Sequence, residues 1–207
     1  MNSKITICIL FCVLFTILGC KSNENNRILH LETQIADPSY MEGCINITSQ
    51  DLKRQVGYRN IFPGKTTVGE IETLVGKPEK IFDSPDDSIT EWYYSEFNVF
   101  INDGIVDWIG TEGLLTIKEI VMQYGCPEMI IHRLREGEGP KRIYFIYFSS
   151  GVRLSNENSI LPLNTDEKLF FVEYIRPVPS VAQYFDRPDV SNDPSTTFII
   201  PWSDAVK

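Results

Sequence analysis

The chain of 207 residues contains one short segment twice. The first copy, TVGEIETLVGKPEKI, begins at Thr67, and the second, TIKEIVMQYGCPEMI, begins at Thr116, so the offset is 116 − 67 = 49 residues. Each copy opens with a threonine followed three positions later by a glutamate. This spacing is typical of a capping box, in which the hydroxyl accepts from a backbone amide and the carboxylate reaches back. A repeated segment with its own start signal predicts the same supersecondary unit twice.

Apolar residues recur in both copies at the spacing of one helical face. They are Val68, Ile71, Leu74 and Val75 in the first copy and Ile117, Ile120, Val121 and Tyr124 in the second. Gly76 and Gly125 stand where a left-handed residue ends a helix, and Pro78 and Pro127 prevent its continuation. A helix this short is marginal alone, so each one is expected to pack against a β-surface.

Residues with high β-propensity follow both predicted helices. The segment EWYYSEFNVFINDGIVDWI begins at Glu91 around a turn at residues 102–104, and RIYFIYFSSGVRL begins at Arg142 with its turn at residues 149–151. The two turns are offset by 149 − 102 = 47 residues and are taken as equivalent hairpins. The expected fold class is α+β, with two tandem helix-plus-antiparallel-sheet units and a C-terminal capping segment.

The C-terminal part has no further helix with a Gly-x-Pro end. LFFVEYIRPVP, from Leu169, predicts a strand, and SVAQYF, from Ser180, predicts a turn or two of helix. TFIIPW, from Thr197, is a short apolar extension. This part is expected to cap the array, as terminal segments of repeat folds do.

The first twenty residues have the pattern of a signal peptide. One cation, Lys4, precedes an uncharged apolar run from Ile5 to Leu18, shorter than the roughly 20 residues that span a membrane. The ending Ile-Leu-Gly-Cys at residues 17–20 resembles the bacterial lipobox, which implies cleavage before Cys20 and a diacylglycerol on its sulfur. The alternative is an uncleaved anchor or an ordinary signal peptide. Either interpretation places the folded part outside the cytoplasm.

These signals divide the chain into segments. The expected segments are a signal peptide at 1–19, a lipidated cysteine and tether at 20–40, a first unit at 41–112, a second unit at 113–160, and a C-terminal strand and capping segment at 161–207. After cleavage, Cys44 and Cys126 are the remaining thiols and form a candidate disulfide pair, although the sequence does not supply the Cα separation that a disulfide demands.

The charge balance is acidic. The formal net charge is −9, from 19 lysines and arginines against 28 aspartates and glutamates. Most of the surface therefore repels a phosphate backbone, and nucleic acid is not an expected partner.

The repeated pattern T-x-x-E-[IV]…G-x-P, followed in the first copy by W-Y-Y…D-G-x-V, resembles the SmpA/OmlA-like family of outer-membrane β-barrel assembly lipoproteins. The tandem arrangement is similar to that of the β-lactamase inhibitory protein family. The resemblance covers about residues 62–155. It implies a non-enzymatic protein whose sheet or loops bind another protein of the cell envelope.

Strand alternation divides the aromatic residues between two sheet faces. Phe97, Val99 and Ile101, with Tyr144, Ile146 and Phe148 in the second copy, are assigned to the face that the helices cover. The candidate partner-binding residues on the opposite face are Trp92, Tyr94, Phe100, Trp108, Phe145 and Tyr147. An open aromatic face is typical of a protein-binding site. The alternative is a second structural layer, in which the C-terminal segment covers these residues or they pack the two units together.

Catalytic chemistry has little support in the sequence. The one candidate nucleophile–base pair is Cys126 with His132. Cys126 occupies the position at the end of the helix that Lys77 holds in the first copy, so this position tolerates different residue types. No cluster has the ligand spacing of a zinc site, and the carboxylates of DSPDDS, from Asp83, lack the spacing of a calcium loop. No catalytic residue, metal or cofactor is predicted.

Two function classes remain. The first is a cell-envelope lipoprotein, anchored to the membrane through a lipid on Cys20, that acts as a non-catalytic protein-binding or assembly module for an unidentified envelope protein. The second is a lipid-anchored inhibitor of an extracellular enzyme. A sensor of a small apolar ligand between the units is a weaker third interpretation. The sequence does not predict the oligomeric state.

Overall fold

The computed structural model describes residues 33–44, 56–83, 89–134, 141–157, 160–187, 190 and 196–207. The expected signal peptide, the lipidation site Cys20 and most of the tether lie outside these residues. The chain divides into two compact units, Met1–Asp37 and Pro38–Lys207. In the first unit, residues 33–36 are helical. Within the described ranges, no helix has the length and apolar character needed to cross a bilayer.

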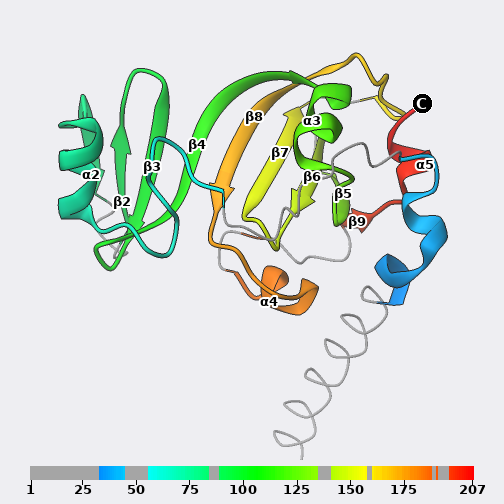
Figure 1. The fold of residues 1–207 in the computed structure, drawn as a ribbon, viewed down its shortest axis with the longest axis horizontal. Coiled ribbons are helices and arrows are strands. Elements are labelled where there is room, and N and C mark those ends of the chain that lie inside the picture. The colour runs from blue at the N-terminus through cyan, green and yellow to red at the C-terminus, as the bar shows by residue number, and fades with distance from the viewer. Residues whose placement is uncertain are drawn as a thin grey trace, which may run out of the picture. The chain divides into compact units, whose positions relative to one another are not determined.

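Within these described residues, an antiparallel sheet of nine strands dominates the second unit (Figure 1). The strands are β1 (Lys80–Asp83), β2 (Ile89–Tyr93), β3 (Phe97–Asn102), β4 (Ile105–Thr116), β5 (Met129–Arg133), β6 (Arg142–Tyr147), β7 (Val152–Glu157), β8 (Lys168–Ile175) and β9 (Thr197–Ile199). Their order is β1-β2-β3-β4-β8-β7-β6-β5-β9. The fold is therefore mixed α+β and consists mainly of one continuous sheet.

Short helices accompany the sheet. They are η1 (Pro38–Met41), α2 (Val68–Val75), α3 (Ile117–Tyr124), α4 (Val181–Phe185) and α5 (Trp202–Ala205). Helices α2 and α3 lie where the repeated segment predicts them. The Thr67 amide donates to the Glu70 carboxylate at 2.8 Å, and the Thr116 amide donates to Glu119 at 2.8 Å. The predicted capping boxes are thus confirmed at both helix starts.

Both helices also end as predicted, at a glycine in the left-handed half of backbone space. The φ angles are +85° at Gly76 and +80° at Gly125. A side chain at either position would be strained, so glycine fixes the residue at which each helix stops.

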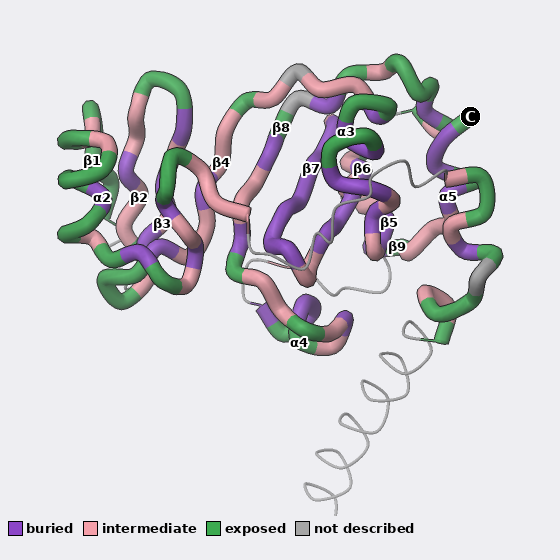
Figure 2. Tube along the Cα trace, in the orientation of Figure 1, coloured by how far each residue is buried: buried purple, intermediate pink, exposed green. Residues whose placement is uncertain are grey.

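The two helices cover different halves of the same sheet face (Figure 1). Ile71 of α2 packs in a cluster with residues of β2, β3 and β4, and the apolar face of α3 packs with residues of β5 to β8. The register places Ile109 of β4 opposite Tyr174 of β8, and Tyr174 opposite Val152 of β7. Because directly opposed residues share a face, one apolar layer continues across the middle of the sheet. Figure 2 shows the buried segments of this layer along β7 and β8.

The hairpins differ from the prediction in their connections. The turn at residues 102–104 joins β3 to β4, whereas the turn at residues 149–151 joins β6 to β7. The turn at residues 102–104 therefore joins the third and fourth strands after α2, whereas the turn at residues 149–151 joins the second and third strands after α3, so the two predicted hairpins are not at equivalent places. The β-rich run at residues 91–101, predicted as one strand, is divided into β2 and β3 by a tight turn at residues 94–97.

The C-terminal part contributes strands β8 and β9 to the sheet. The strand predicted from Leu169 is β8, which lies between β4 and β7 at the centre, and the helix predicted from Ser180 is α4. Strand β9 pairs with β5 at one end of the sheet. In the described portion of the C-terminal part, β9 and α5 therefore have the terminal placement expected of a cap, whereas β8 does not.

Candidate functional site

Trp92 does not lie on the open face, contrary to the prediction. It is 6% exposed and belongs to the core cluster that contains Ile71 of α2. The Tyr94 amide donates to the Phe97 carbonyl at 2.9 Å, which closes a tight turn and places Trp92 opposite Val99. The sequence prediction assumed that side chains alternate between the two sheet faces without interruption through residues 94–97. A turn with two central residues pairs odd with even positions, so the assignment of Trp92 was reversed.

Phe145 and Tyr147 are also buried, at 1% and 3% exposure, against α3. Phe145 pairs with Leu154 and Tyr147 with Val152, both on the helix-covered face. Ile146, which was assigned to the helix side, points the other way and is also buried. Because β6 is apolar on both sides, alternation of hydrophobicity did not identify which side faces the helix.

Tyr94 is also on the α2 side, contrary to the prediction: it is partly buried, its ring stacks on Phe97 and its hydroxyl donates to the Gly76 carbonyl. The last two predicted residues, Phe100 and Trp108, are partly buried on the opposite face.

Trp108 and Tyr94 line a groove of about 700 Å³. Most of the side chains that form this groove come from β3, β4, β7 and β8 on the sheet face turned away from α2 and α3, and Tyr58, Tyr94 and Phe97 reach it from the α2 side. Phe171 of β8 also lines it and is 39% exposed. This opening is called the sheet groove below.

Trp108 is held in place as a wall of the sheet groove. Its ring stacks on Phe100 of the neighbouring strand, with centroids 3.5 Å apart and planes at 12°. A Cβ atom on Gly110 would stand only 2.8 Å from Cζ3 of the indole. Gly110 therefore leaves the space that the indole occupies, and the stack presents one rigid aromatic surface.

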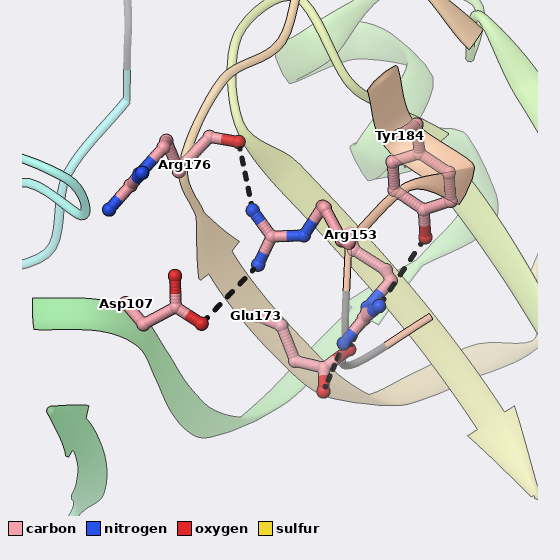
Figure 3. Close-up of polar contacts among 6 residues, drawn as sticks. Asp107, Arg153, Glu173, Arg176 and Tyr184 are labelled. Atoms are coloured by element: carbon pink, nitrogen blue, oxygen red, sulfur yellow. Dashed lines mark hydrogen bonds and ion pairs between the residues drawn. The ribbon is translucent and has the colours of Figure 1, made fainter. Parts of the chain in front are cut away.

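A buried ion pair supports the opposite wall (Figure 3). Arg153 of β7 donates from Nε to Glu173 Oε2 at 2.6 Å and from Nη2 to Oε1 at 3.2 Å. Its Nη1 donates to the Tyr184 hydroxyl of α4 at 3.4 Å. This two-pronged contact fixes Glu173, which lines the groove, and holds α4 against the groove-bearing face of β7.

A second arginine ties the segment after β8 to β4. Arg187 is buried, and its Nη1 donates to the carbonyl oxygen of Arg176 at 3.2 Å. Its Nη2 lies 3.9 Å from Asp107 Oδ2. Figure 3 shows the Asp107 and Arg176 groups that this guanidinium joins. Because Asp107 immediately precedes Trp108, this contact also stabilises the strand that carries the indole.

The charges that line the sheet groove are largely paired. Glu96 forms an ion pair with Arg59, and Arg142 forms one with Glu157. Glu112 adds an exposed carboxylate. The groove therefore combines aromatic surface with several polar groups of both signs, which suits recognition of a partner by contact and hydrogen bonding.

The candidate nucleophile–base pair is not assembled as a reactive centre. Cys126 is disulfide-bonded to Cys44, with Cα atoms 6.0 Å apart, so it is not a free thiol in this structure. Burial, together with the charge of Lys141, lowers the pKa of His132 on β5. The Nε2 atom of His132 is buried without a hydrogen-bond partner in the described part of the chain. Among the described residues, no group of three or more histidines, cysteines and carboxylates is placed to hold a metal ion.

Fold and site together describe an α+β protein with a nine-stranded sheet and one grooved face. The sequence matches no protein-family model and no curated protein. An extracellular protein containing an SCP domain from Bacillus anthracis str. Ames is similar in structure, with 11% identity and a TM-score of 0.39 over 74% of this chain and 55% of that one. A DUF4309 family protein, YjgB, from Bacillus subtilis subsp. subtilis str. 168 has 15% identity and a TM-score of 0.40 over 60% of this chain and 89% of its own.

Proposed function

We propose that the protein is a cell-envelope lipoprotein, attached through Cys20, that binds another protein without catalysing a reaction. The lipobox-like ending at residues 17–20 supports the anchor. The disulfide between Cys44 and Cys126 supports a place outside the cytoplasm, because disulfides persist in oxidising compartments.

The observation that carries the binding role is the sheet groove. One face of the sheet is covered by α2 and α3, whereas the other presents the Trp108–Phe100 stack beside the exposed ring of Phe171. Rigid aromatic side chains provide large contact area at low entropic cost, and they are enriched at the centres of protein interfaces. The ion pairs around the rings supply the polar rim that such interfaces have.

We further propose that the fold consists of two tandem units, α2-β1-β2-β3-β4 and α3-β5-β6-β7-β8. The matching caps support this, and so does the strand order, which runs outward in both directions from the β4–β8 pair. Tyr94 donates a hydrogen bond to the Gly76 carbonyl, and Tyr147 donates one to the Gly125 carbonyl. The same contact thus fixes the end of each helix, as duplication of one unit predicts. This arrangement also agrees with the resemblance to the SmpA/OmlA-like family.

A photocrosslinking experiment in the native host tests the binding role. A benzoylphenylalanine group replaces Phe171 in the sheet groove in one strain and Met122 in another. Met122 is a matched control, because it is 56% exposed and lies on α3, on the covered side of the sheet. We expect a discrete adduct with one protein from position 171 and none from position 122.

Equal crosslinking from both positions, or none from position 171, would contradict the proposal. Identification of the adduct by mass spectrometry separates the two function classes. A protein of the same cell envelope supports a binding or assembly module, whereas a secreted hydrolase supports an inhibitor.

The anchor has its own test. In the Cys20→Ala variant, the protein is expected to move from the membrane fraction to the soluble fraction or to remain unprocessed. Cleaved protein that stays in the membrane fraction would show that Cys20 does not carry the anchor.

A further inference from the structure

Strand β1 ends the sheet on the side of α2, within the described part of the chain. All four of its residues are exposed, including two large apolar side chains, Ile81 at 50% and Phe82 at 53%. Leu74 of α2 and Ile89 of the neighbouring β2 are exposed as well. Figure 2 shows this end of the sheet as mostly exposed. An end strand with apolar residues on both faces is a template for pairing with another strand.

Strand β5 is the counterpart of β1, because each follows its helix after the Gly-x-Pro stop at the same offset of 49 residues (129 − 80 = 49). Unlike β1, β5 is covered. Met129, Ile130 and Ile131 are buried, and β9 pairs antiparallel with the outer edge of β5. In that pairing Ile131 stands opposite Ile199. Among the residues that the structure describes, β5 therefore has a strand added to its outer edge and β1 has none.

We propose that β1 binds an extended segment of another protein as an added antiparallel strand, as β5 binds β9. Main-chain hydrogen bonds to the open edge would supply affinity, and side chains facing Ile81 and Phe82 would supply specificity. The segment is apolar, like β9. It is flanked by basic residues, because carboxylates outnumber the single cation around the apolar pair, with Glu79 and Asp83 against Lys80, and the whole chain carries a net charge of −9.

A second copy of this chain fits the edge less well. Two β1 strands that pair antiparallel with the same faces up can centre on Ile81 or on Phe82. Centring on Ile81 places Glu79 opposite Asp83 of the second copy, a like-charge pair that destabilises a sheet. Centring on Phe82 places Ile81 opposite Asp83, an apolar residue against a charge. An edge of four residues is also small for a stable dimer, which buries on the order of 1,200 Å² or more.

This binding edge is separate from the sheet groove and does not depend on it. The groove lies over β3, β4, β7 and β8, whereas β1 is the outermost strand. A negative result for the sheet groove therefore does not count against the β1 edge, and a negative result for the β1 edge does not count against the groove.

Disulfide trapping with a defined peptide tests the proposal. The probe is a synthetic peptide of residues 196–200, TTFII, with two lysines added at each end and cysteine in place of Ile199. The protein is the full-length chain carrying Phe82→Cys. The register of β5 with β9 and the offset 131 − 82 = 49 place position 82 opposite position 199 of the peptide. Met122→Cys is the matched control, because Met122 is as exposed as Phe82 but lies on a helix.

Each trapping rate is divided by the rate at which the same protein thiol reacts with a small aromatic disulfide, and the unsubstituted chain gives the background. We expect the Phe82→Cys thiol to trap the peptide at least tenfold faster than the Met122→Cys thiol. Replacing Phe198 of the peptide by proline should remove this advantage, because proline cannot donate to the ladder. Ile81→Cys with the peptide cysteine moved to position 200 is a second variant with the same expected result.

Equal normalised rates at positions 82 and 122 would overturn the proposal. Trapping that does not change with the proline peptide would also overturn it. If two Phe82→Cys chains form a disulfide with each other faster than with the peptide, the edge belongs to a second copy and the proposal is wrong.

Discussion

The hydroxyl of Tyr147 donates a 2.8 Å hydrogen bond to the carbonyl oxygen of Gly125, the residue at which α3 ends. Both residues are buried, so water cannot replace the lost donor. Tyr147→Phe should therefore lower the free energy of unfolding by about 1–3 kcal/mol, the cost of leaving a buried acceptor unpaired. Denaturant unfolding measures this loss.

The matched variant is Tyr94→Phe. Tyr94 makes the same contact with the carbonyl oxygen of Gly76, at 3.1 Å, but Gly76 is exposed. Its carbonyl can bind water instead, so the loss should stay below about 1 kcal/mol. Equal losses in the two variants would mean that burial does not decide the strength of this contact.

The disulfide between Cys44 and Cys126 joins the segment after η1 to the end of α3 across a sequence separation of 82 residues. Its closure restricts the unfolded chain, and a loop of this length corresponds to roughly 2–5 kcal/mol. Reduction, or the double variant Cys44→Ser with Cys126→Ser, should lower the thermal midpoint. An unchanged midpoint after reduction would show that the bond contributes nothing to stability.

His132 should make the fold sensitive to acid. Its pKa is lowered in the folded state, first by burial and then by the charge of Lys141, so the unfolded chain takes up this proton more readily. Stability should therefore fall as the pH drops below the unfolded value of about 6.5. The loss of unfolding free energy between pH 7.5 and pH 5.5 should be smaller in His132→Phe than in the unsubstituted chain. A loss of the same size in both would contradict this assignment.

Two of the arginine–glutamate pairs near the groove should differ in strength. Arg153 and Glu173 are largely buried, with side-chain exposures of 9% and 18%, whereas Arg142 and Glu157 are more exposed. Glu173→Gln should cost about 3 kcal/mol or more, because it leaves a buried guanidinium without its carboxylate. Glu157→Gln should cost less than about 1 kcal/mol. Denaturant unfolding of both variants gives the comparison, and a larger loss for Glu157→Gln would contradict it.

The local signals in the sequence predicted the helices correctly. A capping box and a helix-ending glycine act through hydrogen bonds and backbone angles within a few residues, so Thr116, Glu119 and Gly125 specify α3 without knowledge of the rest. Strand β8 and helix α4 were predicted from equally local patterns of β-propensity and from their proline boundaries.

The faces of the sheet were harder to predict, because they depend on pairing between distant residues. The tight turn before Phe97 reversed the assignments of Trp92 and Tyr94. Strand β6 is apolar on both sides, so Phe145 and Tyr147 were placed on the wrong face.

The antiparallel pairing of β4 with β8 involves residues far apart in the chain, and no local sequence pattern predicts it. Trp108 and Phe100 were correctly placed away from the helices, but only coordinates reveal that Gly110 makes room for the indole.

Gly110→Ala probes this arrangement with a small change. The added methyl would stand 2.8 Å from Cζ3 of Trp108, so the ring must shift. We expect a several-fold lower yield of the adduct formed from position 171, with little loss of stability because Gly110 needs no left-handed backbone. An undiminished yield would indicate that the position of the indole is not important for binding.

We propose that the sheet face turned away from α2 and α3 binds a partner protein. The most direct measurement is the yield of the photocrosslinked adduct from position 171 in a Trp108→Ala background, with circular dichroism to confirm that the chain is folded. We expect a drop of at least tenfold in a folded protein. A folded Trp108→Ala variant that gives the same adduct in the same yield would contradict it.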